Sequence, residues 1–424
     1  MRVLLTGANG FIGSQITAEL RAAGHDVVAA VRDPAKFQRR FPGSTAFAID
    51  MNSATIESAW AGHLSGIDAV VNCAGTLQSR NGEQAHAIHT ASPIALFHAA
   101  AARGIRKIIQ ISAVSIAADT EYAVTKKAAD DALMALDVDW VILRPSLVYG
   151  RVAYGGTAML RALAACPLVI PVIGKGDQMV TPIAVEDLAR SVRRALDAPG
   201  MNRKVLYPCG PETMTLATLM QRYRGWLGLK PAPLLHVPRA LVGFAAKLGD
   251  ALGTSSLTTT ALVQLDHGNA ADPAVFAAVV GQTPRSVDEV LATAPAGTAD
   301  LWHARLYLLR PVIQASLVLL WALSGLSGLL APSATISALF PWLGAAAAPL
   351  GYAASLFDLV IAALVLRGRW PKQAFILQLL TVLGYTLIVT LSLPHLWLDL
   401  FGPLLKNIPI LALIIIQRVL DEER

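Results

Sequence analysis

Three glycines near the start of the chain have the spacing of a loop that binds a phosphate group. Residues 4–13 read LLTGANGFIG, in which an apolar strand runs into Gly7, Gly10 and Gly13 before a helical pattern begins. Glycine is required where a chain turns tightly, where its backbone approaches a pyrophosphate, and where a helix packs closely on a strand. The start of the helix then offers oriented amide groups to the anion. The sequence therefore predicts a nucleotide-binding loop, with an ordinary turn as the alternative.

A second pair of residues has the spacing for joint chemistry. Tyr122 and Lys126 stand four positions apart, so their side chains lie on one face of a predicted helix. No metal site and no disulfide framework are expected, because the cysteines and histidines lack the necessary spacing. The cysteines are Cys73, Cys166 and Cys209, and the histidines, which we interpret as structural, include His86, His89, His236 and His267.

Up to residue 282, short β-branched runs alternate with helical patterns. These runs cover residues 3–5, 27–31, 69–71, 107–111 and 140–143. Strands and helices that alternate at this spacing indicate βαβ units around a buried parallel sheet. We therefore expect an α/β domain over residues 1–282. Pro284, Pro295 and Gly297 interrupt the pattern that follows, which predicts a linker over residues 283–310.

The composition argues against a wholly soluble protein. Apolar residues make up 54% of the chain and charged residues only 15%, where about 25% is usual in soluble domains. The same balance excludes disorder and a tail that binds nucleic acid. After Arg310, four apolar runs have nearly the length of about 17–25 residues that spans a bilayer. They cover residues 312–330, 350–366, 375–393 and 400–416, and predict a transmembrane domain over residues 311–424. A buried soluble bundle is the alternative.

The cations predict the orientation of these spans. Positive residues lie before the first span, between the second and third, and in the tail, whereas residues 331–349 carry no charge. The cations are Arg305, Arg310, Arg367, Arg369, Lys372, Arg418 and Arg424. By the positive-inside rule, we expect a multi-pass protein of a bacterial-type inner membrane, with its soluble domain and C-terminus in the cytoplasm.

Two charged residues fall inside predicted spans. Asp358 lies in the second span and Lys406 in the fourth. Such a charge costs at least about 2.5–3.5 kcal/mol on insertion scales and normally faces a partner or a polar cavity. We expect the two residues to pair. The alternative is that Lys406 extends toward the headgroups while Gln378 or Tyr385 satisfies Asp358.

The glycine loop resembles the cofactor loop of the extended and atypical short-chain dehydrogenase/reductase families. AVVNCAG, YAVTK, LRPSLVYG and QMVTPIAVEDLA look like the other signatures of that superfamily, in its usual order. The likeness is greatest to the branch that contains the nucleotide-binding accessory subunit of respiratory complex I. The C-terminal part is similar to the DoxX-like membrane family, notably in FDLVIAALVL and GPLLKNIPIL. This resemblance implies an α/β fold, a Rossmann-type doubly wound parallel sheet with a small C-terminal α/β extension, followed by a four-helix transmembrane bundle.

The resemblance also implies a nicotinamide cofactor and the residues that hold it. They are Thr6, Gly7, Asn9, Gly10, Phe11, Ile12, Gly13, Arg32, Asp50, Met51, Cys73, Ala74, Gly75, Tyr122, Lys126 and Pro145. Dehydrogenases that prefer NAD usually carry an acidic residue where this chain has Arg32, so NADP is favoured and NAD is the alternative. The choice between NADP and NAD stays open, because Asp33 lies next to Arg32 and because Arg32 could be a solvated loop residue that contacts no cofactor. Asp50 and Pro145 fit ordinary turns equally well.

Catalytic roles are implied in the same way. Tyr122 would transfer a proton as hydride moves, while Lys126 lowers the pKa of the phenol and holds the nicotinamide ribose. Ala113 stands where the family has its catalytic serine, and Ser112 or Ser115 could substitute. The short interval between Ser112 and Tyr122 argues against a sugar-nucleotide substrate. A pair that only binds cofactor is the alternative.

Together these features predict a membrane-anchored NAD(P)(H)-dependent oxidoreductase. Its substrate would be a hydrophobic carbonyl, alcohol or quinone-like molecule at the cytoplasmic membrane face, and the lipid bilayer would be its other partner. The alternative is a non-catalytic nucleotide-binding module for assembly or sensing in a membrane complex. The Tyr122 and Lys126 pair favours the enzyme, and Ala113 favours the second hypothesis.

Overall fold

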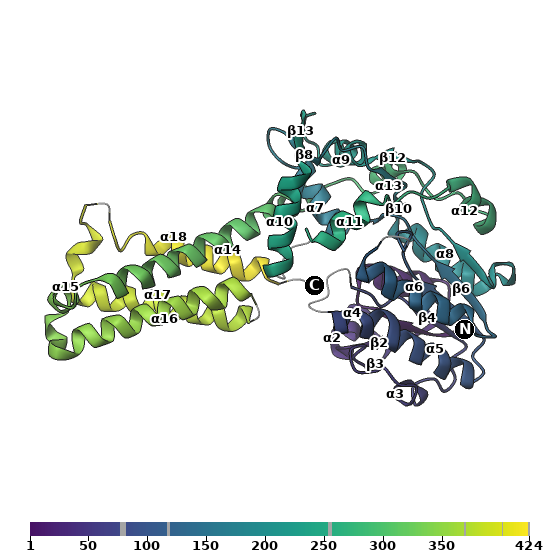
Figure 1. The fold of residues 1–424 in the computed structure, drawn as a ribbon, viewed down its shortest axis with the longest axis horizontal. Coiled ribbons are helices and arrows are strands. Elements are labelled where there is room, and N and C mark those ends of the chain that lie inside the picture. Colours follow the sequence, from purple (N-terminus) through teal and green to yellow (C-terminus); the bar gives the residue numbers. More distant parts are fainter. Residues whose placement is uncertain (77–81, 117–118, 253–256, 369, 401, 423–424) are drawn as a thin grey trace. The chain divides into compact units, whose positions relative to one another are not determined.

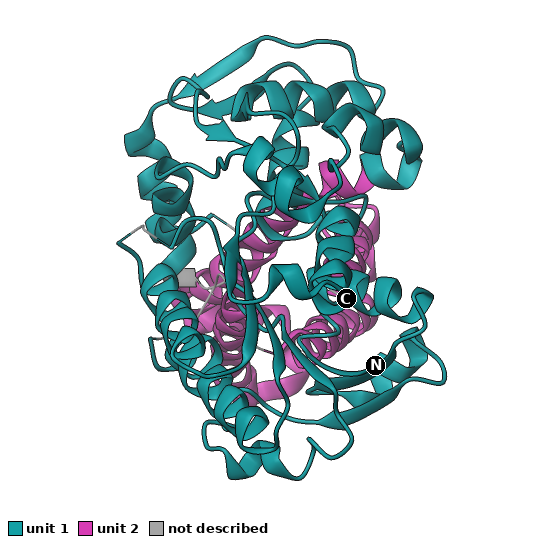
Figure 2. Cartoon of the chain, turned by 90° about the vertical axis from the view of Figure 1, so that its right-hand side faces the viewer, with its two compact units in different colours: residues 1–301 teal, residues 302–424 magenta. Residues whose placement is uncertain are grey.

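The chain divides into two compact units. This computed structural model describes residues 1–76, 82–116, 119–252, 257–368, 370–400 and 402–422. Unit 1 comprises Met1–Leu301 and unit 2 comprises Trp302–Arg424 (Figure 2). Two of the cations used to predict the orientation, Arg369 and Arg424, lie outside the described residues.

Unit 1 is built on a seven-stranded parallel sheet (Figure 1). In spatial order its strands are β11 (Lys204–Leu206), β6 (Asp139–Leu143), β5 (Lys107–Ile111), β4 (Ala69–Asn72), β1 (Arg2–Thr6), β2 (Asp26–Val31) and β3 (Thr45–Ala48). Parallel strands are covered on both faces, which explains why they read as continuous apolar runs in the sequence. The strands predicted from those runs are present, and the prediction of a parallel sheet is confirmed.

Helices cover both faces of the sheet, as the prediction of a doubly wound fold requires. On one face lie α1 (Phe11–Ala22), α2 (Pro34–Arg40) and α8 (Val185–Asp197), which contribute Ile16, Phe37 and Leu188 to the core. On the other face lie α3 (Ser58–Ala61), α5 (Ser92–Ala102) and α6 (Glu121–Met134), which contribute Trp60, Leu96 and Leu133. Before α5, the short α4 (Gly82–His86) continues into a π-helix, η1 (Ala87–Ala91).

The strand order reverses at β1, whose neighbours are β4 and β2. Ligands of open parallel sheets bind outside the carboxyl ends of the strands at such a point. Thr6 and Asn72 pair at the ends of β1 and β4, and the Asn72 amide donates to Gln110 on β5 at 2.7 Å. This line of buried polar side chains aligns three strand ends, so the fold positions a site at this edge.

A small α/β extension completes unit 1 and confirms the prediction of one. Its strands pair as β7 (Val148–Tyr149) with β10 (Ile183–Ala184), β8 (Ile170–Ile173) with β13 (Leu234–Val237), and β9 (Met179–Val180) with β12 (Met214–Thr215). Its helices are α7 (Gly155–Ala164), α9 (Leu216–Trp226), α10 (Arg239–Leu252), α11 (Thr259–Asp266), α12 (Pro273–Val280) and α13 (Val287–Thr293), whereas η2 (Pro199–Met201) leads from α8 to β11 of the main sheet. α12 packs on the sheet core, whereas α9 and α13 share a separate core with β8.

The structure differs from the linker predicted over residues 283–310. α13 begins with a capping box formed by Ser286 and Glu289, and its Val287 and Leu291 are buried in the core of the extension. α14 (Thr298–Leu330) then starts in unit 1 and runs on into unit 2. The prolines and the glycine that indicated a linker lie between helices, so they mark helix boundaries rather than a flexible segment.

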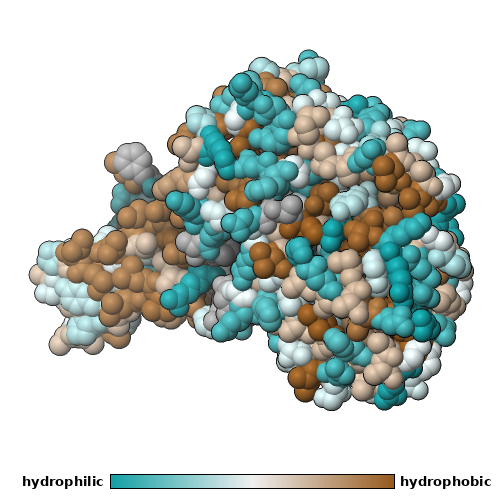
Figure 3. Space-filling view, turned by 45° about the vertical axis from the view of Figure 1, so that its right-hand side comes forward, coloured by the Kyte–Doolittle hydropathy of each residue, from teal (hydrophilic) through white to brown (hydrophobic). Residues whose placement is uncertain are grey.

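Unit 2 is a set of apolar helices. They are the remainder of α14, α15 (Ser333–Leu339), η3 (Pro341–Ala346), α16 (Ala347–Arg367), α17 (Pro371–Ser392), η4 (Pro394–Trp397) and α18 (Asn407–Leu420). Among the described residues, three helices are long and apolar enough to cross a membrane: Thr298–Leu330, Pro341–Arg367 and Pro371–Ser392. The face of this unit seen in Figure 3 carries a broad brown area with paler residues at one end, and many of its leucines are exposed. Apolar surface of this extent suits contact with lipid.

The fourth predicted span is shorter than expected. Its helix, α18, has 14 residues and starts at Asn407 rather than at residue 400. At about 1.5 Å per residue it is roughly 21 Å long, whereas the hydrocarbon core of a bilayer is about 30 Å thick. Gly402 adopts a positive φ of 49°, and residues 403–406 form turns, which delays the start of the helix.

The ion pair predicted between Asp358 and Lys406 does not form. The buried carboxylate of Asp358 accepts hydrogen bonds from Ser324 Oγ on α14 at 2.7 Å and from the Tyr385 hydroxyl on α17 at 3.0 Å. Lys406 is exposed just before α18, because that helix starts late. Of the two alternatives, the structure therefore supports satisfaction of Asp358 by Tyr385.

Small residues bring α14 and α16 close together beside this carboxylate. A Cβ added to Gly325 would lie 2.7 Å from the Ser355 carbonyl oxygen, and one added to Gly328 would collide with the Ser355 hydroxyl. Glycines at such positions allow the backbones of membrane helices to pack closely. The other predicted partner, Gln378, instead accepts from the Trp321 indole at 3.0 Å.

Candidate functional site

The glycine loop forms a tight cradle after β1. Gly7 has a φ of 67°, and a Cβ added there would lie 2.8 Å from the Cys73 carbonyl oxygen. A Cβ on Gly13 would collide with the backbone of Gly7. The Gly10 N–H donates to the Gly7 carbonyl at 2.9 Å, which closes the turn. The backbone itself therefore requires glycine at both Gly7 and Gly13.

The first turn of α1 suits an anion. Gly10 is the N-cap, no side chain caps the helix, and no acidic residue lies in the first turn. The first amide groups of a helix have no partner within it and carry partial positive charge. Asn9, Phe11 and Ile12 are partly buried around this turn. The loop thus fits a pyrophosphate, in agreement with the predicted cofactor role of these residues.

At the end of β2, Arg32 is exposed while Asp33 is engaged elsewhere. The Asp33 carboxylate accepts from the Lys36 N–H at 2.9 Å and caps α2. A capping carboxylate is held by its own helix. Arg32 is therefore the more available of the two side chains for an incoming ligand.

Asp50 and Met51 lie in a local turn after β3. The Asp50 carboxylate accepts from the backbone N–H of Asn52 at 3.0 Å and from its side chain at 2.8 Å. The Met51 sulfur accepts from the Ser92 hydroxyl at 3.3 Å. This is the ordinary turn chemistry weighed above, and the cofactor contact of Asp50 stays a prediction.

The segment after β4 is fixed to the glycine loop by Thr6. Its hydroxyl accepts from the N–H of Cys73 at 3.1 Å and of Ala74 at 3.3 Å, and it donates to Asn72. Burial raises the pKa of the Cys73 thiol to about 12, against the opposing charge of Lys126. Cys73 is therefore a neutral thiol at physiological pH, and the segment offers its backbone rather than a nucleophile.

Lys126 reaches the same segment from α6. Its ammonium group donates to the Ala74 carbonyl at 3.2 Å and to the Ile111 carbonyl at 3.1 Å. A Cβ added to Gly75 would lie 3.1 Å from the Lys126 Nζ. Tyr122 stands one turn earlier on the same helix. The structure thus brings the predicted catalytic pair to the carboxyl ends of β4 and β5, beside the predicted cofactor segment.

Burial controls the protonation of this pair. It raises the pKa of Tyr122 to about 12, and the negative charge of Asp130 adds to the effect. It lowers the pKa of Lys126, which the charge of Asp130 partly offsets. The expected lowering of the phenol pKa by Lys126 is not found, because burial and the charge of Asp130 both raise that pKa. At neutral pH, Tyr122 is a protonated phenol that can donate a hydrogen bond or a proton.

Ser112 is committed to a buried carboxylate. Its hydroxyl donates to Asp130 Oδ2 at 2.8 Å, and Arg144 Nε donates to the same oxygen at 3.0 Å. Asp130 is fully buried, so losing either donor would leave its carboxylate poorly satisfied. Ser112 is therefore a weak replacement for the serine missing at Ala113.

Ser115 connects the site to the extension. Its hydroxyl donates to Gln264 on α11, and the Gln264 amide donates to the Thr120 hydroxyl at 2.7 Å. Thr120 in turn caps α6 by accepting from the Ala123 N–H at 3.2 Å. Gln264 could not be predicted from local sequence patterns, because its partners lie 144 and 149 positions away. This contact orders the start of the helix that carries Tyr122.

His89 is a site residue that the sequence analysis classed as structural. Its ring meets that of Tyr122 edge to face, with centroids 5.2 Å apart. Nε2 accepts from the Thr76 N–H at 3.0 Å, and Nδ1 lies 3.1 Å from the Thr125 hydroxyl. Burial and the charge of Lys126 lower the pKa of His89 to about 3. A neutral imidazole therefore supports the ring of Tyr122. The π-helix η1, which holds His89, is a feature that often occurs at functional sites.

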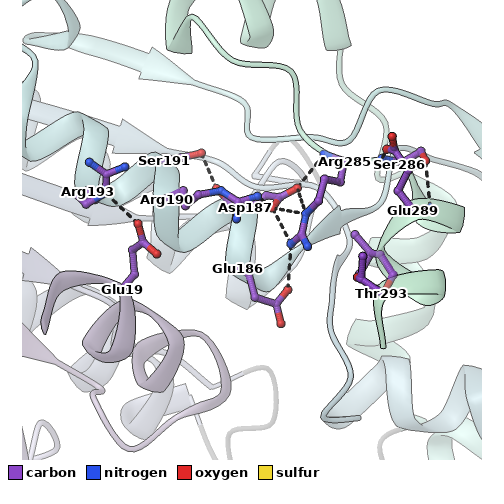
Figure 4. Close-up of polar contacts among 11 residues, drawn as sticks. Glu19, Glu186, Asp187, Arg190, Ser191, Arg193, Arg285, Ser286, Glu289 and Thr293 are labelled. Carbon is purple, nitrogen blue, oxygen red and sulfur yellow. Dashed lines mark hydrogen bonds and ion pairs between the residues drawn. The ribbon is translucent and has the colours of Figure 1, made fainter. Parts of the chain in front are cut away.

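Pro145 and the later QMVTPIAVEDLA motif hold the surrounding elements together. The Pro145 carbonyl accepts from the Val114 N–H at 3.1 Å, which fixes the loop after β5. Figure 4 shows Asp187 of α8 accepting from Arg285, with Asp187 Oδ1 2.8 Å from one guanidinium nitrogen. Arg193 donates to Glu19 on α1 at 2.8 Å. These contacts join the extension and the sheet around the site, and a cofactor contact of Pro145 stays a prediction.

Comparisons with known proteins agree with this geometry. Residues 7–199 match the NAD(P)H-binding family model, and residues 318–415 match the DoxX-like family. The chain is 29% identical over 262 residues to a ceramide reductase of Caulobacter vibrioides. The aligned region covers 61% of this chain and 80% of that protein. The chain is also 29% identical over 255 residues to an epimerase family protein of Mycobacterium bovis, which covers 55% and 81%.

A solved structure shows the same fold. The UDP-glucuronic acid 4-epimerase from Bacillus cereus, in complex with UDP-glucuronic acid and NAD, aligns with a TM-score of 0.55 at 19% identity. The alignment covers 72% of this chain and 100% of that chain.

Proposed function

Because the chain joins an NAD(P)-binding Rossmann domain of the short-chain dehydrogenase/reductase type to a C-terminal DoxX-like domain, we propose that it is a membrane-anchored oxidoreductase acting on a hydrophobic carbonyl or alcohol. The observation that carries this proposal is the position of Lys126. Its ammonium group lies at the ends of β4 and β5 and contacts the segment that runs past the glycine cradle. Tyr122 lies beside it, so a proton donor and a nucleotide cradle share one edge of the sheet.

Each residue has a distinct task in this proposal. The amides of α1 and the cradle around Gly7 bind the pyrophosphate, and Lys126 orients the adjoining ribose. A bound nicotinamide supplies or accepts the hydride. Tyr122 gives its proton to the substrate oxygen during reduction and takes it back during oxidation. With Ala113 at the usual serine position, Tyr122 is the donor on which that oxygen depends most.

The substrate class follows from where the domain is held. Three apolar helices tie unit 1 to a bilayer, and a substrate that partitions into lipid is then concentrated near it. The relative named ceramide reductase favours a long-chain lipid carbonyl over a sugar nucleotide. The exposed Arg32 favours NADP, and the cations near the helix ends favour a cytoplasmic site.

The test uses the full chain in lipid nanodiscs with NADPH and long-chain ketones. Tyr122→Phe should lower kcat by about 10²–10⁴-fold, the usual contribution of a general acid, while nucleotide binding stays nearly intact because only the hydroxyl is lost. Tyr207→Phe is a matched control, since Tyr207 is a partly exposed tyrosine that contacts Arg144. Undiminished turnover in Tyr122→Phe would refute the mechanism. A wild type that binds nucleotide but turns over no ketone or long-chain alcohol would instead support the non-catalytic module, which Ala113 and the committed Ser112 favour.

A further inference from the structure

Helix α10 presents an apolar face that no described residue covers. Leu241, Phe244 and Leu248 are 62%, 71% and 52% exposed. Their spacing of three and four residues places them on one side of the helix. Soluble surfaces rarely gather large apolar side chains in this way unless the patch binds something.

The opposite face of α10 is apolar as well. Val242 and Ala246 are buried, and they pack against Leu262 of α11. α10 thus has two apolar faces, separated by the polar residues Arg239, Lys247 and Asp250. Since the protein itself covers only one side of α10, the other side needs an apolar environment from outside unit 1.

We propose that the face formed by Leu241, Phe244 and Leu248 lies in the interfacial region of the bilayer that holds unit 2. Unit 1 passes into its membrane helix without a linker, because α14 begins at Thr298 and continues to Leu330. This continuous helix tethers unit 1 to the membrane unit. α10 also exposes Lys247, a cation of the kind that interfacial helices direct toward anionic headgroups, whereas Arg239 at its start pairs with Asp266 of α11.

This placement connects the membrane to the candidate site. α11 lies between α10 and that site: its Leu262 packs on α10, while its Gln264 binds Ser115 and Thr120 at the start of the Tyr122 helix. A lipid substrate that leaves the bilayer along α10 therefore has one helix to pass before it reaches the site. This consequence rests on the proposed function, whereas the docking of α10 does not.

The test measures where α10 lies in the full chain. Cys73, Cys166 and Cys209 are replaced by alanine, and a nitroxide is attached to Phe244→Cys in nanodiscs of phosphatidylcholine and phosphatidylglycerol. Val275→Cys on α12 is the matched control, since Val275 is 59% exposed and also belongs to unit 1. Paramagnetic resonance then compares relaxation by oxygen, which concentrates in lipid, with relaxation by a water-soluble nickel chelate. We expect oxygen to dominate at position 244 and nickel to dominate at position 275.

Two results would overturn the proposal. Dominance of nickel at position 244 would show that α10 faces water. Low accessibility to both reagents would show that protein covers it, either unit 2 or a second copy of the chain. If the cysteine-free chain does not fold, labelling of the unmodified chain by a photoactivatable phospholipid in the same nanodiscs decides the question, with label on α10 around Phe244 and none around Val275 as the expected result. Neither measurement needs turnover, so their outcome is independent of the Tyr122→Phe test.

Discussion

The neutral imidazole of His89 makes the stability of unit 1 depend on pH in a way that one substitution can isolate. His89 is 1% exposed. Burial, followed by the charge of Lys126, lowers its pKa from an ordinary value of 6.5 to about 3, although the hydrogen bond from Thr76 opposes the shift. As the pH falls, the unfolded chain therefore binds the proton before the folded chain does.

The sign and size of the effect follow from this order. The stability that neutral His89 contributes is complete above pH 6.5 and is lost progressively between pH 6.5 and about 3. Each pH unit in that window corresponds to about 1.4 kcal/mol for one proton. Lowering the pH from 7 to about 4.5 should therefore remove about 2.7 kcal/mol of unfolding free energy through this residue alone.

The assay is pulse proteolysis in urea on the full chain in detergent, at both pH values. His89→Asn removes the titrating group and keeps a polar side chain, so its acid-induced loss should be smaller than that of the wild type by about 2–3 kcal/mol. His267→Asn, at an exposed position of the extension, should lose as much as the wild type. For each variant, the free energy of unfolding at the lower pH is compared with the value for the same variant at pH 7. A destabilisation of His89→Asn that is independent of pH therefore does not affect the result. Equal losses in the wild type and His89→Asn would refute a neutral buried imidazole beside Tyr122.

Three further predictions concern the cofactor, the membrane carboxylate and the orientation. NADPH should bind the wild type more tightly than NADH, and Arg32→Asp should reverse that order in nucleotide titrations; equal wild-type affinities would contradict the assignment. In a double-mutant cycle, the effects of Asp358→Asn and Ser324→Ala on the free energy of unfolding should be coupled by about 0.6–1.7 kcal/mol, the range of hydrogen bonds between membrane helices. The effects of Asp358→Asn and Lys406→Met on the same free energy should be additive. Cysteine labelling in intact cells should find Ser333 outside and Lys372 inside, and matching sidedness would overturn the cytoplasmic orientation of unit 1.

Local patterns predicted the parts of the fold that depend on local forces. The glycines at positions 7, 10 and 13 are set by steric limits within a few residues, so their spacing alone located the cradle. Tyr122 and Lys126 share a helix face for an equally local reason. The buried strands could be predicted from their apolar runs, because strands of a sheet that is covered on both faces do not alternate between polar and apolar residues.

The features that the sequence did not reveal depend on contacts between distant segments. A lone histidine carries no signal until η1 brings His89 against Tyr122. Ser112 was a candidate catalytic residue, but the distant Arg144 and the helix residue Asp130 draw its hydroxyl into a buried network. Lys406 was placed inside a span because hydropathy does not register the turn at Gly402 that delays α18.

The carboxylate of Asp358 imposes an order on how unit 2 can be made. A ribosome delivers α14 first, α16 second and α17 last, so Ser324 is available to Asp358 before Tyr385 exists. An aspartate at the centre of a lone helix opposes insertion by about 2.5–3.5 kcal/mol. α14 and α16 are therefore best released into the bilayer as a hairpin, with Gly325 and Gly328 letting the nascent helices meet. During biosynthesis, these two glycines would let α14 pack against α16 early, so that Ser324 can hydrogen-bond the Asp358 carboxylate before α17 is inserted.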